Sequence, residues 1–261
     1  MQRKRIETDI AAFPSAFTEI LQNATLYDSS CSPEARVYFI DRDDGYYLKK
    51  APKGSLQREA ELTQYFHQKG LGTEILSYLS EECDWLLSRR MRGEDCTDRV
   101  YLDDPKRLCD TIATSLRALH EMDFSDCPVK DHTAHYLSVA KRNYEQGTVD
   151  LSFAPKEFCN ATAKEAWEFL QSHGHLLERN TLLHGDYCLP NIMLDNWCLS
   201  GFIDLGNGGV GDRHVDLFWG AWTLRFNLGT DDFRNRFFDA YGRDKIDADR
   251  LTIVAVAECF G

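Results

Sequence analysis

Basic residues are in short supply in this chain. Its 261 residues include 30 Lys and Arg against 42 Asp and Glu, so the formal net charge at pH 7 is −12. Nucleic acids and anionic membranes are bound through basic surfaces, and the charge balance therefore argues against both as partners. A cationic small molecule would instead be attracted.

Long apolar runs are also missing. No stretch approaches the roughly 18 apolar residues that cross a bilayer, so we expect no membrane-spanning segment. The N-terminus carries basic residues, but Glu7, Asp9 and Pro14 come soon after them, and no apolar signal-peptide core appears. We therefore expect a cytoplasmic protein.

None of the nine cysteines forms a Cys-x-x-Cys pair. This absence argues against a zinc knuckle and against a dithiol redox motif, and scattered free thiols indicate a reducing compartment. His132 and His135, like His173 and His175, are closely spaced, but no carboxylate or cysteine completes a metal-binding set at a typical spacing. We expect these histidines at the surface.

The pattern of what is present divides the chain in two. Hydrophobic residues make up 43% and charged residues 28%, as in an ordinary soluble globular protein. The first part alternates in the manner of strands, with a short helix at residues 14–21 and another helix at residues 56–68; the expected strands are residues 24–27, 35–41, 46–49, 74–79 and 84–89. Later segments show helical spacing of apolar residues; the expected helices are residues 105–120, 233–241 and 246–260, with another after Asp212.

The stretch from Leu183 to Leu205 concentrates polar residues suited to phosphoryl transfer. Asp186 follows an apolar strand, Asn191 comes five residues later, and Asp204 follows a second apolar strand. Such a transfer needs a carboxylate that accepts the proton of the attacking hydroxyl, and oxygen ligands that hold Mg²⁺. Asp186 suits the first role, and Asn191 and Asp204 suit the second. Each residue alone is more typical of a turn, but their order is that of a kinase catalytic loop and metal-binding Asp.

The wider pattern is more specific. It consists of His184-Gly185-Asp186, Pro190-Asn191, Phe202-Ile203-Asp204-Leu205-Gly206 and Asp212-Arg213-His214-Val215-Asp216, preceded by Ser125-Asp126-Cys127-Pro128. In this form the chain resembles the aminoglycoside phosphotransferases, and within them the enzymes that modify a 3′-hydroxyl. The resemblance implies an ATP- and Mg²⁺-dependent kinase that inactivates an aminoglycoside and confers resistance, as a monomer or a homodimer.

The resemblance also implies an α+β, bilobal, protein-kinase-like fold. The small β-rich lobe would comprise residues 1–91 and bind the nucleotide. The larger, mainly helical lobe would comprise residues 92–261 and carry catalysis and substrate binding. In this second lobe His184 is expected to support the catalytic loop, and Asp216 either caps a helix or, as we favour, braces that loop.

Lys49 lies where a kinase-like lobe places the lysine that contacts the α and β phosphates, and Glu59 lies early in the next helix, where its carboxylate can pair with it. Lys50 should point to the opposite face of the strand. Without the resemblance, Lys49 and Glu59 would be taken as surface charges.

Four further nucleotide contacts are implied by the resemblance alone. Ser32, in the turn 28–33, would lie nearest the phosphates, although an ordinary hairpin turn fits this segment equally well. The segment 88–91, with Arg89 and Met91, would bind the adenine edge through its backbone. Tyr47 would cover one face of the base, or be an ordinary strand aromatic.

Substrate contacts are expected in two places. The irregular segment 144–160 matches the antibiotic-binding loop of the family and carries Asp150 and Glu157. The C-terminal tail, with Glu258 and Phe260, matches the segment that closes over the antibiotic. The chain departs from the family at three positions that bear on the substrate; these are Phe226 and Ala257, where carboxylates are usual, and Gly261, which extends the tail.

Two other functions fit parts of the pattern. A kinase for another amino alcohol or sugar would share every catalytic residue and differ only in its substrate contacts. A non-catalytic nucleotide-binding module would be expected to lack at least one of the catalytic residues, and all are present. A protein kinase is disfavoured, because only seven residues separate Asp204 from Asp212, too few for an activation segment.

Overall fold

The computed structural model describes residues 3–31, 33, 35–158 and 160–261. They form two compact units. The first comprises the described residues up to Asp95 together with Met193–Gly206, and the second comprises Cys96–Ile192 together with Asn207–Gly261. The chain first passes from one unit to the other after Asp95, four residues beyond the expected boundary at residue 91. The sequence did not predict that residues 193–206 return to the first unit.

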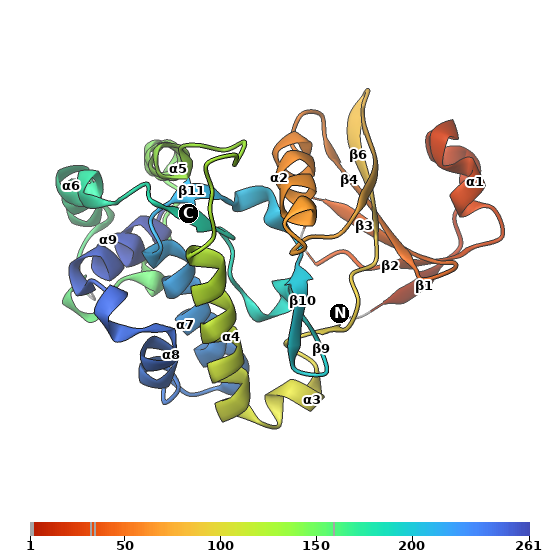
Figure 1. Cartoon of the computed structure of the whole chain (residues 1–261). Coiled ribbons are helices and arrows are strands. Elements are labelled where there is room, and N and C mark those ends of the chain that lie inside the picture. The colour runs from red at the N-terminus through yellow and green to blue at the C-terminus, as the bar shows by residue number, and fades with distance from the viewer. Residues whose placement is uncertain (1–2, 32, 34, 159) are drawn as a thin grey trace. The chain divides into compact units, whose positions relative to one another are not determined.

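A six-stranded antiparallel sheet forms the main body of the first unit, in the order β1-β2-β3-β4-β6-β5 (Figure 1). Its strands are β1 (Lys4–Ile6), β2 (Thr25–Asp28), β3 (Arg36–Asp41), β4 (Tyr46–Pro52), β5 (Ile75–Ser80) and β6 (Cys83–Arg89). The five strands expected from the alternation of the sequence are confirmed. The expected helix at 56–68 is α2 (Gln57–Gln68), whereas the segment before β2 has only one α-helical turn, α1 (Thr18–Leu21), after short 3₁₀ turns.

The two faces of this sheet have different coverings. One face packs on the N-terminal segment, where Phe13 lies 5.7 Å from Trp85 between ring centroids. The other face packs on α2 through Leu56, Ala60 and Leu86. Since alternate residues of a strand point to opposite faces, Lys49 of β4 faces α2. Lys50 lies over the Trp85 ring on the other face, at 4.9 Å, as the alternation predicts.

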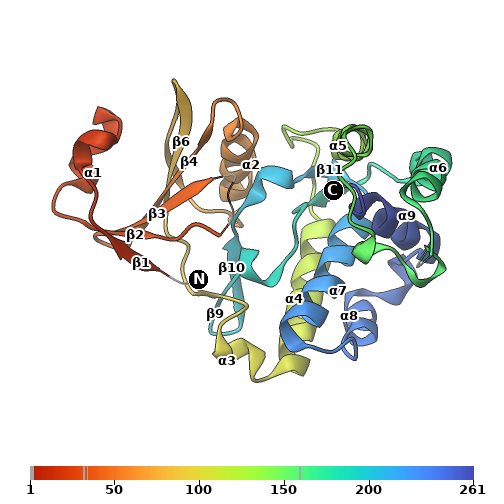
Figure 2. The ribbon, with the colours of Figure 1, turned by 180° about the vertical axis from the view of Figure 1, so that it is seen from behind.

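A smaller sheet completes the first unit, in the order β10-β9-β7. It contains β7 (Glu94–Asp95), β9 (Ile192–Asp195) and β10 (Cys198–Phe202). Asn196 and Trp197 join β9 to β10 with φ of 50° and 68°, the conformation that tight hairpins require. The hairpin is visible from behind in Figure 2. The amide of Phe202 donates to the carbonyl of Leu71, just after α2, at 2.8 Å, and this bond fixes the segment that leads to Asp204.

Helices make up most of the second unit. They are α3 (Arg99–Leu102), α4 (Pro105–His120), α5 (His132–Gln146), α6 (Ala163–His173), α7 (His214–Leu228), α8 (Arg234–Tyr241) and α9 (Ala248–Glu258), with the short strand pair β8 (Thr181–Leu183) and β11 (Gly209–Gly211). Helix α4 packs on α7 and α8, and α7 packs on α9 (Figure 1). In the described parts of the chain, no helix combines the length and the apolarity that crossing a bilayer requires.

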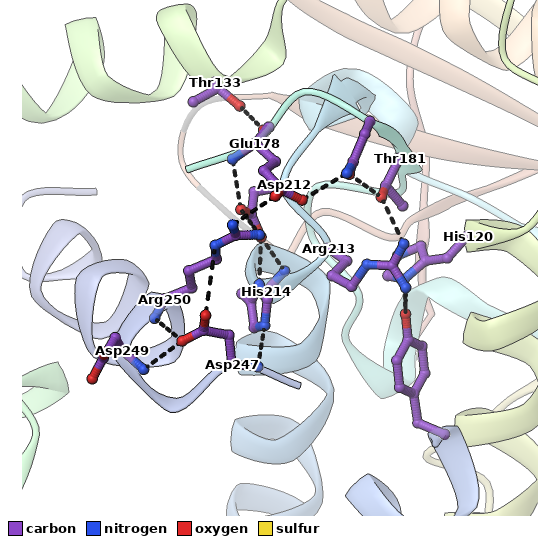
Figure 3. Close-up of polar contacts among 12 residues, drawn as sticks. His120, Thr133, Glu178, Thr181, Asp212, Arg213, His214, Asp247, Asp249 and Arg250 are labelled. Carbon is purple, nitrogen blue, oxygen red and sulfur yellow. Dashed lines mark hydrogen bonds and ion pairs between the residues drawn. The ribbon is translucent and has the colours of Figure 1, made fainter. Parts of the chain in front are cut away.

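A polar cluster fastens the start of α9 to the start of α7 (Figure 3). Asp212 accepts hydrogen bonds from the amide of Glu178 at 2.7 Å and from the ring Nδ1 of His214 at 2.5 Å. The Asp247 amide donates to Nε2 of the same ring at 2.9 Å, so Nδ1 carries the proton. Arg250 joins the cluster through Glu178 at 2.6 Å. The cluster thereby sets the position of α9, whose last residue is Glu258.

Candidate active site

In the first unit, Lys49 is the central member of an ion-paired group of three side chains. Its Nζ lies 2.8 Å from Oε2 of Glu59 and 2.9 Å from Oδ1 of Asp204. Burial favours the neutral amine, but the two carboxylates outweigh it, so the pKa of Lys49 is raised and the side chain remains a cation. Burial and the charge of Asp204 raise the pKa of Glu59, against the effect of Lys49.

Asp204 differs from the other two members in being accessible. Its side chain is 53% exposed, against 20% for Lys49 and 13% for Glu59. Its φ of 58° is a left-handed conformation, which costs a non-glycine residue energy and is common at functional sites. Asp204, which the sequence pattern predicted as a metal ligand, is thus an accessible carboxylate beside Lys49.

A cavity of about 600 Å³ lies in the first unit, and this group forms part of its wall. Five residues expected to bind the nucleotide are brought together there; they are Lys49, Glu59, Tyr47, Arg89 and Met91. Asp204 also lines the cavity. Ser32 lies outside the described residues, although Ser29 and Cys31 of the same turn line the cavity.

Arg3 is a cavity residue that the sequence did not reveal. Its guanidinium donates to the hydroxyl of Tyr47 at 2.8 Å and lies 3.6 Å above the centre of the Phe39 ring. Nothing in an arginine near the N-terminus signals this position, because it depends on the pairing of β1 with β2 at the edge of the sheet. Arg3 therefore holds Tyr47 at the cavity wall.

The loop that was predicted to be catalytic follows β8 in the second unit. Gly185 has φ of 85°, and a Cβ there would lie 1.9 Å from the carbonyl oxygen of Asn207, so the loop requires glycine. Asn191 Nδ2 donates to Oδ2 of Asp186 at 2.9 Å and to its carbonyl oxygen at 3.0 Å. The side-chain amide of Asn191 also carries an oxygen, and such a hard donor is a ligand that Mg²⁺ prefers.

Asp216 braces this loop from the first turn of α7, as favoured from the sequence. It is fully buried, and it accepts hydrogen bonds from the amides of His184 and Gly185, both at 2.8 Å. The ring of His120 contacts it at 3.1 Å. Burial alone would raise the pKa of Asp216, but these hydrogen bonds lower it below the ordinary range.

Two histidines complete the brace. The amide of Asp186 donates to Nδ1 of His184 at 3.2 Å, so His184 supports the loop as expected. Burial lowers the pKa of His120, whose Nδ1 lies 2.8 Å from the Tyr241 hydroxyl. Both ring nitrogens of His120 thus have partners, which is the arrangement of a structural histidine.

Glu258, the expected substrate carboxylate, lies nearly buried at the end of α9, with 6% exposure. Its Oε1 accepts hydrogen bonds from the Tyr136 hydroxyl at 2.8 Å and from the Trp219 indole at 3.1 Å. Burial and, to a lesser extent, the charge of Asp186 raise the pKa of Glu258 to about 7 in spite of these donors. No sequence signal identified Tyr136 or Trp219, which come from α5 and α7.

The raised pKa of Glu258 predicts a pH-dependent stability. A carboxyl that binds its proton more tightly in the folded state stabilises the fold below the unfolded pKa, near 4.5, and loses that contribution as pH rises through 7. Between pH 4.5 and pH 8, we expect the free energy of unfolding of wild type, measured with urea, to fall by about 3 kcal/mol relative to that of Glu258→Gln. A difference between the two proteins that stays constant with pH would contradict this.

The other expected substrate residues occupy different environments. Asp150 is exposed, its amide donates to the carbonyl of Cys259 at 2.8 Å, and its carboxylate caps a short turn at Ser152. The structure thus brings Asp150 to the C-terminal segment. Glu157 is exposed on a 3₁₀ turn.

Two expectations need correction. Phe260 is 0% exposed and packs edge-on against Tyr144 and Trp167, so its ring belongs to the core and does not face a ligand. His132 is buried at 4% exposure and stacks on Tyr136, whereas a surface position was expected. The burial of Phe260 comes from the packing of α5, α6 and α9, which the sequence alone does not show.

A model of the phosphotransferase enzyme family matches residues 33–252. The chain belongs to this family. Within it, the chain is 52% identical over 259 residues to a probable aminoglycoside 3′-phosphotransferase of Lactococcus lactis subsp. lactis, covering 99% of this chain and 98% of that protein. It is 32% identical to the aminoglycoside 3′-phosphotransferase of Niallia circulans, over 78% of this chain and 79% of that one. The predicted resemblance to aminoglycoside phosphotransferases is confirmed, and the chain is a phosphotransferase.

Solved structures agree on the fold of this phosphotransferase. The aminoglycoside phosphotransferase APH(3″)-Id from Streptomyces rimosus superposes with a TM-score of 0.78 at 24% identity, covering 97% of this chain and 99% of that one. The aminoglycoside 3′-phosphotransferase of type VIII gives 0.76 at 22% identity, with 96% of each chain covered. The predicted protein-kinase-like fold is therefore confirmed.

Proposed function

We propose that this phosphotransferase transfers the γ-phosphoryl group of ATP to the 3′-hydroxyl of an aminoglycoside. The near-full-length identity of 52% to a probable aminoglycoside 3′-phosphotransferase carries the proposal for the substrate. A structure of the Streptomyces rimosus relative contains ADP and streptomycin, which supports a nucleotide and a cationic antibiotic as the ligands.

The cavity of the first unit fits ATP. Lys49 supplies a cation for the phosphates, and the carboxylate of Glu59 holds its ammonium in place. The backbone of residues 88–91 and the ring of Tyr47 offer polar and flat apolar surfaces of the kind that a base requires.

A magnesium ion also fits the donor set of the chain. Asp204 offers an accessible carboxylate, and Asn191 offers an amide oxygen, and hard oxygens are the ligands that Mg²⁺ takes. When bound, the ion neutralises charge on the phosphates. Asp204 and Asn191 are the residues we propose to hold it.

Asp186 is the proposed general base. Its Oδ2 accepts a hydrogen bond from Asn191, which fixes the side chain, and an ionised carboxylate has further acceptor sites for the substrate hydroxyl. The brace from Asp216 and His184 holds the backbone around it. Asp186 can thus orient the hydroxyl and take its proton as the phosphoryl group is transferred.

The substrate is tested with purified protein and MgATP. ADP release is measured with kanamycin, which has a 3′-hydroxyl, with tobramycin, which lacks it, with choline, and with ATP alone. We expect turnover with kanamycin only. Equal turnover of tobramycin would refute the 3′ position, and turnover confined to choline would identify a kinase for another amino alcohol.

The nucleotide half of the proposal predicts a contrast between neighbouring lysines. Lys49→Ala should lower kcat/KM for ATP by about 10²-fold, because it removes a cation aimed at the phosphates. Lys50→Ala is the matched control, since Lys50 lies on the opposite face over Trp85. Steady-state kinetics with varied ATP measure both, and similar losses in the two variants would contradict the assigned role of Lys49.

A further inference from the structure

A row of three aromatic rings, half-buried at Trp219 and Trp222 and exposed at Phe226, runs along α7. Phe226 is 70% exposed, the highest value among the large hydrophobic side chains in the described ranges. It stacks on Trp222 at 4.9 Å with an interplanar angle of 12°, and Trp222 meets Trp219 edge-on at 5.3 Å. We call Trp219, Trp222 and Phe226 the aromatic ladder.

The inner end of the ladder lies at the catalytic loop. The indole of Trp219 donates a hydrogen bond to Glu258, and the charge of Asp186 helps to raise the pKa of that Glu258. One turn later on α7, the Thr223 hydroxyl accepts a hydrogen bond from the amide of Leu189, in the loop itself, at 3.1 Å. Since residues three and four apart share a helix face, Trp219, Thr223 and Phe226 lie on the side of α7 that faces this loop.

A second element makes the ladder rigid. Phe153 packs against Trp219 at 5.7 Å and against Trp222 at 6.1 Å. It ends the short 3₁₀ turn that Asp150 caps. Two of the three rings, Trp219 and Trp222, are therefore packed before any ligand arrives, and packed rings lose little entropy when a ligand binds.

The rings suit a cationic ligand better than a second copy of this chain. An aromatic face attracts an ammonium group within about 6 Å of its centre. The negative charge of Asp186, which acts on Glu258 at the inner end, adds to that attraction. Two copies with a net charge of −12 each would repel one another.

We propose that the aromatic ladder binds a ring of the aminoglycoside substrate, with Trp222 and Phe226 against its ammonium-bearing face. This inference rests on the proposed function and concerns how the same substrate is recognised. The Oε1 atom of Glu258 already accepts two hydrogen bonds from the protein. Aromatic contact would thus add affinity next to a carboxyl group whose Oε1 is already bonded to Tyr136 and Trp219.

The test compares Phe226→Ala with Phe226→Tyr, which keeps the stacked ring. Leu176→Ala is the control, because it truncates another exposed apolar side chain, 45% exposed, away from α7. We expect Phe226→Ala to raise KM for kanamycin about fivefold, with kcat within about twofold and KM for ATP unchanged. Phe226→Tyr and Leu176→Ala should resemble wild type. An unchanged KM for kanamycin in Phe226→Ala would overturn the inference.

Tryptophan fluorescence separates this inference from the proposed function. Kanamycin is titrated without ATP into wild type and Phe226→Ala, and we expect a saturable signal that is weaker in the variant. If wild type turns over no aminoglycoside, the proposed function fails, and this titration alone decides whether the ladder binds a cationic sugar. Equal binding by both proteins overturns the inference, as does sedimentation showing a wild-type dimer that Phe226→Ala dissociates without a change in kanamycin binding.

Discussion

Asp186→Asn lowers kcat by about 10²–10⁴-fold if Asp186 is the general base, because an amide cannot take the proton of the substrate hydroxyl. KM for ATP should change little, since the lysine and carboxylates that line the nucleotide cavity are intact. Asn is close in shape to Asp, so the loop should keep its backbone bonds. The measurement is steady-state ADP release with kanamycin and MgATP at saturating concentrations.

The matched control is Asp195→Asn. Asp195 is exposed at the end of β9, where its carboxylate accepts a hydrogen bond from the neighbouring Asn196 at 2.8 Å. The same chemical change there should leave kcat within about twofold of wild type, as surface substitutions away from special features usually do. An Asp186→Asn protein with the turnover of this control would rule out the general base.

The sequence predicted those parts of the site that depend on local spacing. Lys49 and Glu59 were identified through the resemblance to the family, on a predicted strand and at the start of the next helix, and their 2.8 Å contact agrees with those positions. Asp186 and Asn191 lie five residues apart in one loop, and they are joined by a hydrogen bond. Short-range patterns succeed here because β4, α2 and the loop after β8 each form from adjacent residues.

Long-range packing accounts for what the sequence did not show. Arg3 reaches Tyr47 across 44 residues, and Tyr136 reaches Glu258 across 122. Neither pair has a local signal, since each depends on how distant strands or helices pack. The same holds for the return of residues 193–206 to the first unit, which joins Asp204 to Lys49 across 155 residues.

Asp216 combines the two kinds of information, because its sequence position suggested a brace and its partners come from elsewhere. Its buried carboxylate accepts hydrogen bonds from two backbone amides and contacts the ring of His120. Each of these donors would be costly to leave without an acceptor. The loop that carries Asp186 therefore depends on a single carboxylate in another element.

Asp216→Ala should destabilise the fold by about 3–5 kcal/mol, because it leaves two buried backbone amides and the His120 ring without an acceptor, at about 1–3 kcal/mol each. Asp110→Ala is the matched control, since it breaks the exposed ion pair with Arg236 and should cost no more than about 1 kcal/mol. Urea unfolding monitored by circular dichroism measures both. If Asp216→Ala does not fold, Asp216→Asn replaces it, because the amide keeps the shape but offers only one acceptor oxygen.

The lowered pKa of Asp216 fixes how this difference depends on pH. Its stabilisation is fully present above the unfolded pKa, near 3.8, and is lost as pH falls through the lower folded pKa. The gap between wild type and the Asp216 variant should therefore be constant from pH 5 to pH 7 and narrow below about pH 4. Equal losses in the Asp216 and Asp110 variants, or a gap that widens in acid, would show that Asp216 does not support the loop as a buried carboxylate.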